Sequence, residues 1–137
     1  MEAASSVSAP PVLEGLFRSD PPALLGGRCE RCGGTHFPRQ SVCPHCRSED
    51  ASEVALGGDG VVYSYTVVRA APPGFPGPVP YGLGVVDLPG DGIRVEAILL
   101  AEDLERGISI GDEVEFRLVT WGEGDEARQT YAYEVKR

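Results

Sequence analysis

The chain has 137 residues, 42% of them hydrophobic and 24% charged, which is an ordinary composition for one globular domain or two small ones. Its formal net charge of −9 at pH 7 disfavours unaided binding to nucleic acid or to an anionic membrane surface. The first residues lack the basic and apolar regions of a signal peptide, and no apolar run reaches the ~20 residues of a membrane-spanning helix. We therefore expect a cytoplasmic protein.

Residues 1–25 are predicted to form a tail and a short helix. The tail is small, polar and ends in prolines, which is typical of a frayed terminus. Leu13, Leu16 and Phe17 then recur at helical spacing, and the following proline pair should end the helix. A helix this short is not stable alone, so we expect its apolar side to dock on the rest of the chain or on a partner protein.

Residues 26–52 hold all the cysteines and are predicted to form a zinc ribbon. Two C-x-x-C pairs lie ten residues apart, Cys29 with Cys32 and Cys43 with Cys46. In a reducing cytosol such pairs favour metal binding over disulfides, although thiol redox chemistry stays open. Four thiolates close a tetrahedral shell, whereas a catalytic zinc keeps an open position, so the expected metal is structural.

Iron is the alternative metal, because it also accepts four thiolates. Zinc is favoured because the excursion between the pairs is short and Arg47 stands where a rubredoxin site has glycine. Phe37 is expected to cover the metal site or to pack on the next domain. His36 and His45 are expected on the surface or beside the ligands rather than as catalytic bases.

Residues 53–137 alternate between apolar and polar, which is the pattern of half-buried strands. Five strands are predicted, at 61–68, 81–88, 93–99, 114–118 and 131–135. The second and third should form a hairpin around a Pro-Gly-Asp-Gly turn. Five short strands in 85 residues predict a closed barrel of the OB type, because closure removes exposed strand edges. The fold class is therefore mainly β.

The loop 70–80 joins the first two predicted strands and holds five of the twelve prolines. Such a segment is stiff and extended rather than helical. It is either an exposed connector or a functional surface, since loops of this length in compact domains frequently carry function.

Several motifs occur in one fixed order along the chain. They are Leu-Leu-Gly-Gly-Arg-Cys-Glu-Arg-Cys-Gly at 24–33, Phe-Pro-Arg at 37–39, Cys-Pro-His-Cys at 43–46, Gly-Val-Val-Tyr-Ser-Tyr-Thr-Val-Val at 60–68, Pro-Tyr at 80–81 and Ile-Gly-Asp-Glu-Val-Glu at 110–115. Together they resemble the zinc-ribbon plus OB-fold family of acyl-CoA-associated proteins, from about residue 12 to the end. The resemblance implies an N-terminal helix, a rubredoxin-like ribbon with structural zinc, and an OB barrel.

The resemblance also implies a function. Members of this family are accessory subunits of thiolase-superfamily enzymes, including acyl-CoA thiolases and aldolases that shorten steroid side chains, and others attach to enoyl-CoA hydratase domains. The chain would then be a non-catalytic subunit that binds a thiolase-like enzyme and helps to frame its acyl-CoA channel. The sequence contains no nucleophile elbow or phosphate-binding glycine loop, so the reacting groups of this lyase or acyltransferase complex are expected in the partner.

Five residues in and beside the proline-rich loop are the candidate contacts to the acyl-CoA or to the partner: Arg69, Phe75, Pro76, Pro80 and Tyr81. CoA is itself anionic, so its phosphates would need local arginines or the basic surface of the partner. The low entropy of the loop would let it order against a partner or ligand at little cost.

An OB-type nucleic-acid module is the alternative from another functional class. The segments 1–25, 26–52 and 53–137 carry net charges of −2, +1 and −8. A barrel this acidic lacks the basic groove of single-strand binders, and four thiolates around zinc make the ribbon negative as well. The charge distribution therefore favours the accessory role without a nucleic-acid partner.

Overall fold

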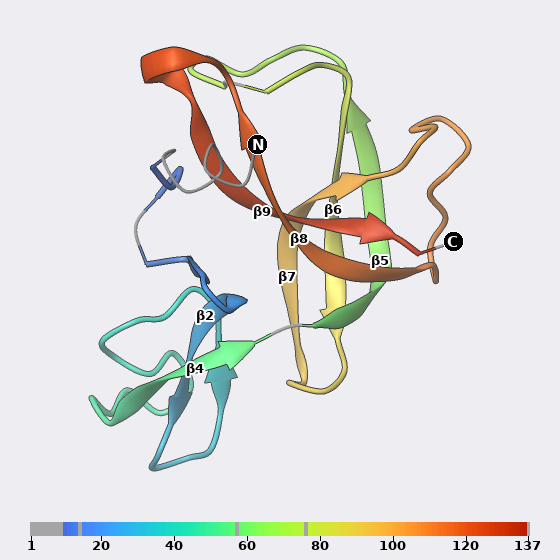
Figure 1. Cartoon of the computed structure of the whole chain (residues 1–137). Helices are drawn as coiled ribbons and strands as arrows, with labels where there is room; N and C mark the ends of the chain where they lie inside the picture. The colour runs from blue at the N-terminus through green and yellow to red at the C-terminus, as the bar shows by residue number, and fades with distance from the viewer. Residues whose placement is uncertain (1–9, 14, 57, 76, 137) are drawn as a thin grey trace.

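The computed structural model describes residues 10–13, 15–56, 58–75 and 77–136. It contains two β-structures joined at the residues that follow β4 (Figure 1). A four-stranded antiparallel ribbon sheet consists of β1 (Phe17–Ser19), β2 (Pro22–Cys29), β3 (Thr35–His36) and β4 (Ala51–Leu56). Strand β2 is central, because β1 and β3 pair with successive halves of one edge while β4 pairs along the other.

The second structure is a closed five-stranded barrel. Its strands are β5 (Asp59–Val68), β6 (Tyr81–Leu88), β7 (Ile93–Leu100), β8 (Glu113–Trp121) and β9 (Arg128–Val135). They follow the order β5-β6-β7-β9-β8, with β7 and β9 parallel and β8 pairing back onto β5 to close the ring. The predicted barrel and its β6–β7 hairpin are thereby confirmed, since closure through a parallel β7–β9 pair is the arrangement of an OB barrel.

The predicted N-terminal helix is wrong, and the part of the chain that the structure describes contains no α-helix. Pro11 instead forms a parallel bridge to Gln129 of β9, and Phe17 begins β1. Gly15 has a φ of 87°, a left-handed value that cannot continue a right-handed helix. The amide of Leu25 in β2 donates to the carbonyl of Leu16, so extended pairing takes the place of helical hydrogen bonds.

The apolar residues of the expected helix also take separate positions. Phe17 is buried in the core, Leu16 is half-buried against it, and Leu13 is 61% exposed. Leu13, Leu16 and Phe17 therefore do not form one docking face.

One hydrophobic core runs through both β-structures. Leu24 of β2 and Leu56 of β4 belong to the same buried cluster as the barrel residues Val62, Val86 and Tyr133. Strand β4 spans the predicted domain boundary after residue 52 and pairs entirely with the ribbon. The ribbon and the barrel are consequently coupled by packing as well as by the chain.

Phe37 reaches the barrel from the segment between the cysteine pairs. Its ring meets Tyr131 of β9 edge-on, with centroids 5.8 Å apart. The ring of Phe17 lies 6.3 Å from the same tyrosine. Of the two expected roles for Phe37, covering the metal site or packing on the next domain, the structure confirms packing on the barrel domain. The described residues form no helix that is long and apolar enough to cross a membrane.

Candidate functional site

The four cysteines converge at the end of the ribbon. Their Sγ atoms all lie within 4.8 Å of one another, with Cys29 and Cys46 3.6 Å apart and Cys32 and Cys43 3.7 Å apart. Four sulfurs placed about 2.3 Å from a central ion would be about 3.8 Å apart, so the spacing fits a tetrahedral zinc site. Cys29 and Cys43 are buried, whereas Cys32 and Cys46 are exposed.

The two C-x-x-C turns have matching backbone geometry. In the first, the amide of Gly33 donates to the carbonyl of Cys29, and in the second the amide of Arg47 donates to the carbonyl of Cys43. The residue after each pair adopts a left-handed φ, 79° at Gly33 and 69° at Arg47. Arg47 therefore occupies the glycine position of the knuckle at some conformational cost.

Backbone amides point at the sulfurs. Those of Arg31 and Cys32 lie 3.4 Å from the Sγ atom of Cys29, and the amide of His45 lies 3.3 Å from that of Cys43. Such donors stabilise thiolates, which are the form that binds metal. The residues present thus fit zinc both by spacing and by their hydrogen bonds.

Ser48 adds a hydroxyl beside two of the ligands. Its Oγ atom lies 3.1 Å from the Sγ atom of Cys29 and 3.4 Å from that of Cys46. The hydrogen bond from Ser48 and those from backbone amides lower the pKa of Cys29 to about 6. At Cys32 the amide of Gly34 acts in the same direction, but partial desolvation and the neighbouring thiols raise the pKa to about 11.

Neither histidine belongs to the metal-binding cluster formed by the described residues. His36 is buried, and its Nε2 atom accepts a hydrogen bond from the amide of Gln40 at 3.2 Å. The Nε2 atom of His45 lies 3.4 Å from the carbonyl oxygen of Thr35. Both rings therefore brace the ribbon.

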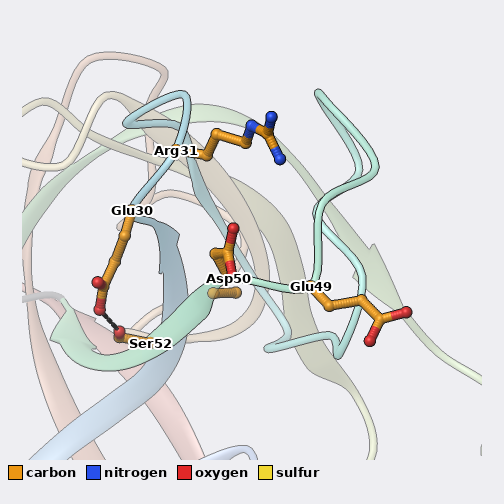
Figure 2. A pocket seen from close by; sticks show the side chains of 6 residues that line it. Glu30, Arg31, Glu49, Asp50 and Ser52 are labelled. Carbon is orange, nitrogen blue, oxygen red and sulfur yellow. Dashed lines mark hydrogen bonds between the residues drawn. The ribbon is translucent and has the colours of Figure 1, made fainter.

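A hollow of about 480 Å³ lies on the ribbon beside the first cysteine pair, and its lining is mainly charged (Figure 2). The hydroxyl of Ser52 donates to the carboxylate of Glu30. Figure 2 shows the side chains of Glu30 and Glu49 directed away from each other across the hollow. These exposed carboxylates do not converge on a common point, so they form no second metal centre.

The proline-rich loop ends in a cluster of three aromatic rings at the far end of the barrel. Phe75 stacks on Tyr81 with centroids 4.4 Å apart, and Trp121 of β8 meets Phe75 edge-on at 5.3 Å. Gly77 lies against the indole, because a Cβ atom there would come within 2.2 Å of Trp121. The loop is therefore packed onto the barrel.

An apolar cavity of about 150 Å³ opens beside this cluster. Its lining comes from the end of the loop, the start of β6, the end of β7 and the residues that follow it, and the end of β8: Pro78, Pro80, Tyr81, Gly82, Leu99, Leu100, Ala101, Leu104 and Trp121. Arg69, at the start of the loop, forms an exposed ion pair with Glu105.

The structure thus brings together four of the five predicted contact residues at one end of the barrel. Phe75, Pro80 and Tyr81 line or flank the aromatic cluster, and Arg69 begins the same loop. Pro76 lies outside the described residues. Sequence reasoning missed Trp121, although its being the only tryptophan, at a strand end before a glycine, was a usable signal.

The fold and the metal centre define a two-part protein in which a four-cysteine ribbon precedes an OB barrel. Two family models match it: residues 20–51 match "ChsH2, rubredoxin-like zinc ribbon domain", and residues 53–119 match "ChsH2, C-terminal OB-fold domain". Zinc is accordingly the structural cofactor of the four cysteines.

Individual relatives agree. A "DUF35 domain-containing scaffold protein" of Methanocaldococcus jannaschii is 35% identical over 82% of this chain and 80% of its own length. The "benzoylsuccinyl-CoA thiolase subunit BbsA" of Thauera aromatica is 30% identical over 93% of this chain and 85% of its own. The solved "Ltp2-ChsH2(DUF35) aldolase" superposes with a TM-score of 0.64 at 29% identity, covering 82% of this chain and 84% of that one. The chain belongs to the DUF35 family of ChsH2-like proteins.

Proposed function

We propose that this protein is a non-catalytic accessory subunit of a thiolase-superfamily enzyme that acts on acyl-CoA. The observation that carries the proposal is the similarity over most of the chain to a subunit of a CoA thiolase and to the ChsH2 chain of an aldolase. The closed shell of four thiolates supports it, because it leaves the metal no coordination position for a substrate.

In this role the ribbon provides structure. Zinc holds the two cysteine pairs together, and the shared core fixes the ribbon against the barrel through Phe17, Phe37 and Tyr131. The proline-rich loop, with Phe75 and Tyr81 packed against Trp121, offers a preformed surface at the opposite end. We assign that surface to contact with the partner at the acyl-CoA channel, which a rigid loop can make with little loss of entropy.

Co-expression with a thiolase-like protein from the same organism tests the proposal. The expected result is a complex that co-elutes through affinity and size-exclusion columns, with a partner that loses its carbon–carbon cleavage activity, by thiolysis or by retro-aldol reaction, when expressed alone. If the two proteins elute separately and the partner is equally active and stable without this chain, the proposal is wrong. The same assay with an enoyl-CoA hydratase identifies the alternative partner.

The role of the loop needs its own variant. Replacing Pro78 and Pro80 by glycine restores chain entropy to the loop without removing an aromatic ring, and should weaken assembly with the partner. Pro89, exposed in the β6–β7 turn, is the matched control, and glycine there should leave assembly unchanged. Equal assembly by both variants would reduce the loop to a connector.

A further inference from the structure

The cavity beside the aromatic cluster has the size of a single side chain. Its volume of about 150 Å³ is below the ~300 Å³ at which small-molecule pockets begin. A cavity of this size lined by apolar groups accepts a molecule about as large as benzene. Its walls are apolar side chains of Tyr81, Leu104 and Trp121, and we call this cavity the socket.

The surroundings of the socket are acidic. The loops 69–82, 99–106 and 121–128 together carry six carboxylates and three arginines. All six carboxylates are exposed: Glu102, Asp103, Glu105, Glu123, Asp125 and Glu126. One arginine, Arg69, is already paired with Glu105. An apolar socket is thus ringed by net negative charge.

Apolar side chains also extend outward from this rim. Val79 is 42% exposed, and the prolines on either side of it are exposed as well. Apolar pockets that a partner's side chain fills and desolvates, surrounded by polar residues, are where protein interfaces concentrate their binding energy. The acidic rim disfavours CoA phosphates at this position and favours a basic protein surface.

We propose that the socket receives one apolar side chain, of the size of leucine, methionine or phenylalanine, from a basic segment of the partner subunit. This inference rests on the proposed accessory function and specifies which surface the partner occupies. The apolar side chain supplies the desolvated contact, and lysines or arginines beside it match the acidic rim. The phosphates of the CoA would then lie away from the acidic rim.

Two kinds of variant test the socket in the full chain with the co-expressed partner. Ala101→Leu adds side-chain volume to the lining and should raise the dissociation constant at least about 30-fold, as for the loss of an interface hot spot. The double charge reversal of Glu102 and Glu123 to lysine changes only exposed side chains and should slow association about tenfold at low salt. That difference should vanish at about 0.5 M NaCl, where exposed charges are screened.

Glu113→Lys is the matched control for charge. It lies exposed at the opposite end of β8, the strand that ends in Trp121, and should bind the partner like the unaltered chain. Thermal unfolding of each variant shows whether it is folded. If the unaltered chain assembles but all socket variants assemble equally well, the socket proposal fails while the accessory function stands.

A second readout does not require the partner. Trp121 is the only tryptophan, so its fluorescence reports occupancy of the socket. A peptide with leucine between lysines should change the emission of Trp121 until binding saturates. The same peptide with glutamates in place of the lysines, or free CoA, should leave the emission unchanged. Saturation by CoA but not by the basic peptide would overturn the proposal and assign the socket to the ligand.

Discussion

Tyr131 joins the ribbon to the barrel, and its ring gives a quantitative test of the shared core. The ring packs on Phe17 and Phe37, and its hydroxyl donates to the carbonyl of Glu96 at 2.7 Å. Tyr131→Phe removes only that hydrogen bond, so the expected loss is about 1 kcal/mol of unfolding free energy. Tyr131→Ala also opens a cavity between ribbon and barrel, and because the side chain is only half-buried we expect about 3 kcal/mol, the lower end for aromatic truncation.

Urea unfolding of the zinc-loaded protein measures both losses, with Trp121 fluorescence reporting the barrel and far-ultraviolet dichroism the whole chain. Tyr65→Phe is the control, since Tyr65 is exposed on β5 and removing its hydroxyl should not change the midpoint. The alanine variant should also unfold in two separate transitions, one for the ribbon and one for the barrel, because the ribbon loses its packing on β9. An alanine variant with the unaltered midpoint and a single transition would refute the shared core.

Four further outcomes are expected. Chelation of zinc should remove amide-exchange protection from β1–β4 while β5–β9 stay protected. Arg47→Gly should raise the unfolding free energy by about 1 kcal/mol, because the left-handed φ of 69° suits glycine; an unchanged value would mean that the arginine is unstrained. Gly77→Ala should push the loop off the indole and shift the emission of Trp121, which circular dichroism would show to be a local change. Burial, together with the carboxylate of Glu96, raises the pKa of Tyr131 from 10.0 to about 12. The contribution of the neutral phenol to the unfolding free energy is therefore complete below pH 10 and falls as the pH rises toward 12. Tyr131→Phe should reduce this fall in the unfolding free energy, measured by urea unfolding between about pH 9 and 12.

The parts of the fold predicted correctly are those in which the signal is local. The spacing within each C-x-x-C pair identifies the four metal ligands, because two intervening residues suffice to turn both sulfurs inward. Alternation with a period of two gives the barrel strands, and the β6 bounds of Tyr81–Leu88 match the prediction. The predicted β6–β7 hairpin is correct because its turn residues are adjacent in the sequence.

The parts predicted wrongly or missed depend on contacts between distant residues. Leu13, Leu16 and Phe17 have helical spacing, but β2 offers Leu16 an extended partner and Tyr131 offers Phe17 a buried site. The aromatic cluster joins Phe75, in the loop between β5 and β6, to Trp121 at the end of β8, and the two rings meet only in the closed barrel. No periodicity in the sequence indicates that these two rings are in contact.

The positions of the two sites refine the expected effect of zinc on partner binding. If the ribbon contacted the partner, loss of zinc would abolish assembly, yet the ribbon and the loop 70–80 lie at opposite ends of the molecule in Figure 1. The structural path between them runs through Tyr131 and the barrel core rather than through a direct contact. If the socket carries the partner, chelation should lower thermal stability strongly while a folded barrel still binds below its unfolding temperature, with a dissociation constant raised less than by Ala101→Leu. Complete loss of binding on chelation of a barrel that remains folded would instead place the ribbon itself in the interface.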